Sequence, residues 1–260
     1  MHQTRTTHAL TIPRPDRDEV ARGGLVELTA LDDLLSSLDD SDWRQPTACG
    51  WTVHEVVAHL LGQHLETARP WTIGGRIRAA RRRFPGLSAL DAHNALQVAT
   101  FSPLSDVELR TRLARVGPRA VRMRRRTPGF IRRQPSERYF PGEPLVEPEL
   151  AYVMDVLSNR DTWMHRLEIA RATGRPFRGG DDGVVAQVVR DLAQEWTGPP
   201  LVLELTEPDG LWRLGDGEPA ARVWTSAIDY LWHLSGRPGE PHLEGDPAAV
   251  EALLAARVVF

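Results

Sequence analysis

Two residues that can carry chemistry, Asp161 and His165, stand four positions apart in one strongly helical segment. Because each residue of an α-helix turns by about 100°, residues four apart lie on the same face. Leu150, Leu157 and Met164 fall on that face too, so the carboxylate and the imidazole are expected to enter an apolar core. A buried carboxylate without a partner costs on the order of several kcal/mol and needs a cation, a metal ion or water. The spacing also suits two ligands of one metal ion, as in the His-Glu-x-x-His pattern.

A further histidine, His59, lies at the edge of the apolar stripe of another predicted helix. That helix begins at Thr52, and Glu55 three residues later completes a capping-box pattern. If the two helices are neighbours, His59, Asp161 and His165 converge on one metal ion. Three protein ligands with an open fourth position are typical of a catalytic metal site.

Simpler interpretations of the same residues remain open. Asp161 can form an ion pair with Arg160 or Arg166, and His59 or His165 can be a hydrogen-bonded core histidine. The spacing alone does not decide between an ion pair and a metal site.

The elements that must position these residues are mostly helical. The segment 147–172 starts with Pro148 and stops at Gly174, as helices commonly do. Apolar residues also recur at helical spacing over 18–38, whereas residues 201–206 alternate as in a strand. The pattern predicts a mainly α protein, a helical bundle followed by a small α/β domain. The expected division is a disordered leader over 1–17, the bundle over 18–178 and the α/β domain over 179–260.

The composition excludes several classes of protein. The 260 residues carry a net charge of -3, which argues against a general nucleic-acid or membrane-surface protein. The single cysteine, Cys49, excludes an intrachain disulfide and suits a reducing cytoplasm. No run of 18 apolar residues predicts a membrane span. All 32 basic residues are arginine, so Schiff-base chemistry on a lysine is excluded as well.

Two motifs resemble the mycothiol-dependent maleylpyruvate isomerase family, which belongs to the DinB-like metal-binding four-helix bundles. The first is Trp43-x-x-Pro46-Thr47-x-x-Gly50-Trp51-Thr52-Val53 followed by Val56-Val57-Ala58-His59-Leu60. The second is a carboxylate four residues before a histidine, here Asp161 and His165, followed by Leu167-Glu168-Ile169-Ala170. Residues 224–237 and Gly245-Asp246 are similar to the second, sterol-carrier-like domain of that family.

The resemblance implies a divalent metal, usually zinc, held by His59, Asp161 and His165. It also implies mycothiol as the thiol cofactor and a small electrophilic substrate that is isomerised or transferred to the thiol. The family pattern prefers glutamate where this chain has Asp161, whose carboxylate reaches about 1.5 Å less. The alternative is a catalytically silent bundle that binds a small ligand or a partner. A cytoplasmic monomer or homodimer without nucleic-acid or membrane partners is expected.

Other residues have weaker signals. Eight arginines within 115–133 suggest an anion site for a substrate carboxylate or the thiol cofactor, but a solvated, loop-rich face is the simpler prediction. Arg237 is a candidate substrate contact or an ordinary helix-end residue. Cys49 is either a reactive thiol or a small loop residue. His54 and His93 are expected at the surface.

Overall fold

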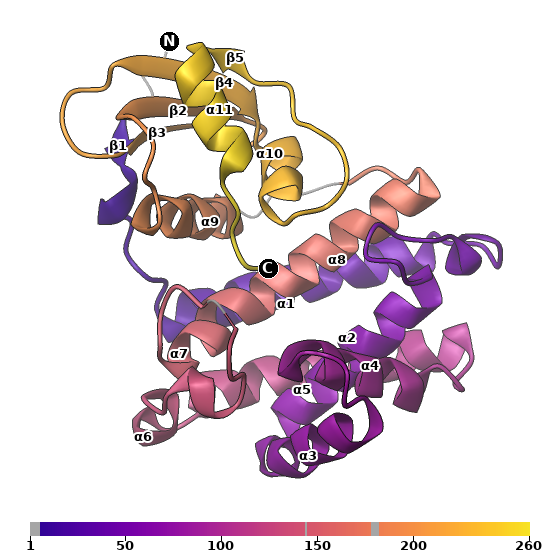
Figure 1. Ribbon diagram of the computed structural model, residues 1–260. Coiled ribbons are helices and arrows are strands. Elements are labelled where there is room, and N and C mark those ends of the chain that lie inside the picture. Colours follow the sequence, from indigo (N-terminus) through magenta and orange to yellow (C-terminus); the bar gives the residue numbers. More distant parts are fainter. Residues whose placement is uncertain (1–5, 144, 178–181) are drawn as a thin grey trace. The chain divides into compact units, whose positions relative to one another are not determined.

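The computed structural model describes residues 6–143, 145–177 and 182–260, and the chain divides into two compact units (Figure 1). One unit is Asp16–Gly179, and the other joins Met1–Pro15 with Gly180–Phe260. The first is helical and the second contains a small mixed sheet, so the predicted fold class is confirmed. The predicted boundary at residues 178 and 179 lies outside the described residues.

Four long helices build the helical unit around one core: α1 (Arg17–Ser36), α2 (Val53–Ala68), α5 (Asp106–Arg126) and α8 (Ser158–Thr173). Helix α2 packs against α5 and α8, while α1 packs against α5 and runs beside α8 (Figure 1). Each helix contributes fully or nearly buried apolar residues to this core, among them Leu31, Leu35, Val56, Leu60, Leu109, Leu113 and Ile169. Burial of this common core holds α2 and α8 side by side, which is what the predicted site requires.

Shorter elements complete this unit. They are α3 (Ile73–Arg83), α4 (Ala89–Phe101), α6 (Gly129–Arg132) and the 3-10 turns Asp42–Arg44, Pro70–Thr72 and Ser136–Arg138. Helix α4 packs on α2, and α3 packs on α4. In the part of the chain that the structure describes, no helix is long and apolar enough to cross a membrane.

The start of α2 is fixed by the predicted capping box. The Thr52 backbone N–H donates to Glu55 Oε2 at 2.8 Å, and the Glu55 N–H donates to Thr52 Oγ1 at 3.3 Å. These bonds satisfy two backbone donors that a helix start would otherwise leave unpaired. They also set the position of His59 two turns further along the helix.

The helix that carries Asp161 departs from the predicted regular period. It begins as α7 (Leu150–Tyr152), continues through a π-helical turn at Val153–Leu157 and becomes α8. A π turn holds one extra residue, so the face before it is rotated relative to the face after it. The turn therefore rotates Leu150, which precedes it, relative to Asp161, whereas Leu157 stands four residues before Asp161 and is half-buried like it.

The arginine-rich segment is also not the loop-rich face that was predicted. Helix α5 continues through Pro118 to Arg126, although proline removes one backbone hydrogen bond from a helix. Leu113 and Val121 lie on either side of Pro118 and are both buried, so packing of the apolar face outweighs the lost bond.

Of the two histidines predicted at the surface, one is buried and the other is half-buried. His93 is buried in α4, with Nε2 2.7 Å from Glu66 Oε2 of α2. His54 is half-buried and hydrogen-bonded to Asp106 and to the Ser102 carbonyl. Both histidines join elements that are distant in sequence, which spacing along the chain does not reveal.

The second unit is a five-stranded sheet in the order β1-β3-β2-β4-β5. Its strands are β1 (Thr7–His8), β2 (Leu201–Thr206), β3 (Gly210–Leu214), β4 (Ala221–Ser226) and β5 (Glu244–Gly245). Strand β2 pairs antiparallel with β3 and parallel with β4. Helices α9 (Asp182–Gln194), α10 (Ala227–Leu234) and α11 (Pro247–Ala255) accompany the sheet (Figure 1).

The N-terminal segment differs from the predicted disordered leader. Residues 1–5 of that leader lie outside the described residues, but Thr7 pairs with Trp212 and His8 with Arg213 in a parallel ladder. Ala9 is fully buried, and the Pro13 carbonyl accepts a 2.9 Å hydrogen bond from Gln187 Nε2. The polar, proline-interrupted composition hid this pairing, because a two-residue strand has no periodicity to recognise.

Close approach of α4 to α2 depends on Gly62. A Cβ at Gly62 would lie 2.7 Å from both Cβ and Cγ of Gln97. We therefore expect Gly62→Ala to lower the free energy of unfolding by about 1–3 kcal/mol through overpacking, despite the better helix propensity of alanine. Gly75→Ala in α3 is the control, because no heavy atom lies within 4 Å of a Cβ there. The free energy of unfolding of the control, measured with urea, should rise by up to about 1 kcal/mol. An equal rise for Gly62→Ala would contradict the packing argument.

Candidate metal centre

The structure brings together the three residues predicted as metal ligands. His59 comes from α2, and Asp161 and His165 come from α8. Asp161 Oδ1 lies 3.7 Å from His59 Nε2 and 3.5 Å from His165 Nε2. One ligand atom from each of the three residues lies within 4.8 Å of the other two.

These separations fit the ligand set of a single divalent ion. Two ligands of a tetrahedral ion with bonds of roughly 2.0–2.2 Å are about 3.3–3.6 Å apart. In addition, both ring nitrogens of the buried His59 are without a hydrogen-bond partner among the described residues. An unsatisfied buried imidazole is costly, and an ion at this point would accept its lone pair. The residues present therefore fit a metal.

Asp161 is held in the form that binds a cation. Burial acts to raise the pKa of Asp161, but the adjacent His165 and His59 and the hydrogen bond from Gln63 lower it well below its usual range. Gln63 Nε2 donates to Oδ2 at 2.8 Å, which leaves Oδ1 facing the two imidazoles. The side chain keeps 20% exposure, against 3% for His59, so the centre is accessible on the side of the carboxylate.

The shorter side chain of Asp161 reaches the site. Glutamate is the usual residue here by the resemblance, and a deficit of about 1.5 Å would be expected from the missing methylene. Asp161 Oδ1 nevertheless lies within 3.7 Å of both Nε2 atoms. The packing of α8 against α2 and α1 brings the backbone close enough for an aspartate.

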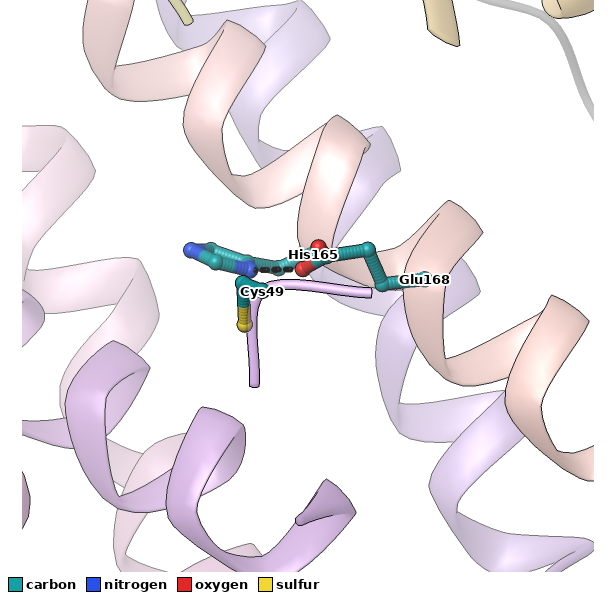
Figure 2. A group of neighbouring side chains, drawn as sticks. All are labelled: Cys49, His165 and Glu168. Carbon is teal, nitrogen blue, oxygen red and sulfur yellow. Dashed lines mark hydrogen bonds and ion pairs between the residues drawn. The ribbon is translucent and has the colours of Figure 1, made fainter. Parts of the chain in front are cut away.

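Glu168 orients the ring of His165. Its Oε2 lies 2.6 Å from His165 Nδ1, and both residues project from the same side of α8 (Figure 2). The carboxylate accepts the Nδ1 proton, so the lone pair of Nε2 points toward Asp161 and His59. Glu168 is buried and lies three residues after His165, so the two side chains share one face of α8.

Cys49 lies beside this histidine and carboxylate, on the loop before α2 (Figure 2). Its thiol is exposed, and Sγ is 3.2 Å from Thr47 Oγ1. Ligand atoms of Cys49, His165 and Glu168 lie within 4.8 Å of one another. Cys49 is thus a loop residue, as one of the two predictions had it, but one at the edge of the candidate centre.

Trp51 and His64 were not identified as part of the site. The Trp51 ring lies 5.3 Å from His59 and 6.3 Å from His165, centroid to centroid, and so borders both imidazoles. His64 is buried, and burial is the main cause that lowers its pKa to about 3, so its ring is neutral. His64 is not among the groups of residues near enough to share an ion in the described part of the chain.

One of the two arginines proposed as partners of Asp161, Arg166, pairs with Glu27. Arg166 Nε donates to Glu27 Oε2 at 2.9 Å, and its Nη2 donates to Glu27 Oε1 at 3.1 Å. The bidentate pair joins α8 to α1. Arg166 follows His165 by one residue, so its side chain points about 100° away from that of His165 on the helix. Helix geometry therefore directs Arg166 away from the candidate centre.

Arg237 belongs to the α/β unit, whereas the three candidate ligands belong to the helical unit. Its guanidinium carbon lies 5.7 Å from the centroid of the Trp232 ring, and the side chain is half-buried. Contact of Arg237 with a substrate stays a prediction.

A test of the orienting role uses Glu168. We expect Glu168→Leu to weaken metal affinity by about 10–100-fold, because the loss of such outer carboxylates typically has this effect. Glu168→Gln should lose less metal affinity, since its amide oxygen can still accept a hydrogen bond from His165 Nδ1. Titration with zinc against a chromophoric chelator measures both, and equal affinities for Glu168→Leu and wild type would exclude the role.

The fold and the site together define a class: a helical bundle with two histidines and one carboxylate at a candidate metal centre, joined to a small α/β unit. The chain belongs to the mycothiol maleylpyruvate isomerase N-terminal domain family, whose model matches residues 25–170. It is also similar to two solved structures, one of the mycothiol-dependent maleylpyruvate isomerase and one of a mutant of it. Identities are 17% and 16%, the TM-score is 0.59 for each, and each match covers 94% of this chain and 97% of the other. None of the curated proteins compared with the chain matches it.

Proposed function

We propose that the protein is a metal-dependent enzyme that uses mycothiol to act on a small electrophilic molecule, as an isomerase or a thiol S-transferase. The observation that carries the proposal is the convergence of His59, Asp161 and His165, with Asp161 Oδ1 3.5 and 3.7 Å from the two imidazole nitrogens. The family and the similar structures support the thiol, since both are named for mycothiol and maleylpyruvate isomerase.

Each residue of the centre has a definable task in this proposal. His59, Asp161 and His165 would hold the ion, zinc by expectation, through Nε2, Oδ1 and Nε2. A divalent ion held there would supply a thiolate nucleophile from a bound thiol for an electrophilic double bond. Glu168 keeps the proton on His165 Nδ1, and Gln63 donates a hydrogen bond to Asp161 Oδ2. Trp51 packs beside the two imidazoles.

The proposal is tested first by the metal content of the purified protein. Elemental analysis after metal supplementation is expected to give about one equivalent of a divalent ion, as a three-residue catalytic site requires. Less than about a tenth of an equivalent would contradict the enzyme function and favour a catalytically silent bundle that binds a small ligand or a partner.

Activity then tests the cofactor. Electrophiles with a conjugated double bond are offered with and without mycothiol, and turnover is expected only with the thiol. Recovery of free thiol after turnover identifies an isomerase, and consumption of the thiol identifies a transferase. Turnover that does not depend on the thiol would contradict mycothiol dependence and point to hydrolysis.

A further inference from the structure

A groove with a volume of about 520 Å³ lies between the C-terminal part of α2 and one face of α5. Leu65 and Met123 contribute apolar lining, and Trp71 stands at the side of α2. The other feature of this lining is its charge: it contains Arg69, Arg112, Arg115, Arg119, Arg122 and Arg126. We call it the arginine groove. None of the candidate metal ligands lines it, so an inference about it does not rest on the proposed function.

Most arginines of the groove have no carboxylate partner among the described residues. Within the described part of the chain, only Arg112 has a carboxylate partner, Glu108 at 3.3 Å, and the other five form no ion pair. The opposite side of the same helix is different. There Arg110 pairs with Asp32 and Arg125 pairs with Asp18, both on α1. Helix α5 thus has a compensated side facing α1 and an uncompensated side facing the groove.

The groove arginines of α5 form a line. Arg112, Arg115, Arg119, Arg122 and Arg126 follow one another at steps of three and four, so they share one helix face over about 21 Å. Residues 69–133 as a whole contain sixteen arginines and three acidic residues. Such a row of like charges disfavours folding unless anions occupy it, and in a concave surface its field is focused on a bound ligand.

The chemistry of the lining indicates which anion fits. Guanidinium groups match the oxygens of phosphate with paired hydrogen bonds, and several in a row suit linked phosphates better than one carboxylate. Trp71 is 74% exposed, which leaves a large aromatic face beside the arginines without a packing partner. Aromatic faces of this kind stack on nucleobases. The groove volume lies in the range of small-molecule sites, roughly 300–1,000 Å³.

We propose that the arginine groove binds a nucleoside polyphosphate, with the phosphates along the α5 arginines and the base against Trp71. The site lies in the helical unit and is separate from the candidate metal centre. A nucleotide bound there is a second ligand of this protein.

The test is calorimetric titration of the full-length protein at fixed ionic strength with ATP, tripolyphosphate and adenosine. ATP is expected to bind, tripolyphosphate to bind more weakly, and adenosine to show no heat. Arg119→Ala/Arg122→Ala should weaken ATP by at least about tenfold, because two charged contacts are lost. Arg81→Ala/Arg82→Ala is the charge-matched control, since these exposed arginines of α3 lie outside the groove, and its Kd should change less than about twofold. Circular dichroism checks that both variants fold.

The base contact is tested separately with Trp71→Ala, which should weaken ATP and leave tripolyphosphate unchanged. Four results would overturn the proposal: no ATP binding at millimolar concentration, an equal loss in both arginine variants, equal affinity for ATP and tripolyphosphate, or far tighter binding of a single-stranded oligothymidylate. ATP binding that persists in the groove variant and disappears in His165→Ala would place the nucleotide at the metal centre and would also overturn it.

Discussion

Purified protein with His165→Ala is expected to retain less than about a tenth of an equivalent of divalent metal, whereas wild type should hold about one. The substitution removes one of three ligand atoms and leaves Asp161 with one imidazole neighbour, His59, at 3.7 Å. Loss of a residue that only hydrogen-bonds to a metal ligand already lowers metal affinity by about 10–100-fold. Loss of a ligand itself should lower the affinity further. His59→Ala is expected to behave in the same way, because it contributes the ligand atom from the other helix.

The matched control for both variants is His242→Ala. His242 is exposed, pairs with Glu244 and belongs to the α/β unit, so its loss should leave the metal content unchanged. Elemental analysis measures all four proteins after the same supplementation and desalting. Full metal content in His59→Ala and His165→Ala would place the ion elsewhere and contradict the candidate centre. Urea unfolding of the metal-free proteins separates loss of the ion from loss of the fold.

Glu27→Gln is expected to cause the largest loss of stability, about 3–5 kcal/mol, because it removes the charge of one member of a buried ion pair. Glu27 on α1 and Arg166 on α8 are each 2% exposed, and two parallel hydrogen bonds of 2.9 and 3.1 Å join them. The guanidinium also lies over the Phe177 ring, with its carbon 4.0 Å from the ring centroid. The amide of glutamine keeps the size of the side chain but cannot accept both N–H groups as a charged carboxylate does.

Asp32→Asn is the control for this prediction. Asp32 and Arg110 also join α1 to another helix, at 2.9 Å, but their side chains are 41% and 39% exposed. Solvent screens such a pair, and its loss should cost less than about 1 kcal/mol. Both variants are compared with wild type by urea unfolding at pH 7. A similar small effect for Glu27→Gln would mean that water reaches the buried pair on substitution.

Much of the candidate site was predictable because its signals are local. The spacing of Asp161 and His165 places both on one helix face whatever surrounds the helix, and the Thr52–Glu55 box fixes where α2 begins. Glu168 lies one turn after His165, so its place near the ring follows from the same period. Gln63 stands four residues after His59 and repeats the spacing of Asp161 and His165. This spacing places Gln63 on the same face of α2 as His59.

The residues that sequence reasoning missed depend on contacts between distant segments. Glu27 and Arg166 are 139 positions apart, and only the packing of α1 against α8 shows that Arg166 is occupied by Glu27 and not by Asp161. Pairing of Thr7 and His8 with β3 joins residues some 205 positions apart, and the π turn at Val153–Leu157 shifts a face that a regular period had assigned. Likewise, the split of the α5 arginines into a compensated and an uncompensated side depends on where α1 lies.

The sequence by itself determined several long helices and the strand at 201–206, the identity of the three candidate ligands and the family resemblance, because periodicity, capping and motif spacing act over a few residues. The tertiary structure alone decided that α2 and α8 are neighbours, that Asp161 reaches both imidazoles despite its short side chain, and that five arginines of one groove form no ion pair with the described residues. The physical reason is that burial of a shared core sets the distances between helices, and those distances are a property of the packed whole and not of any one segment.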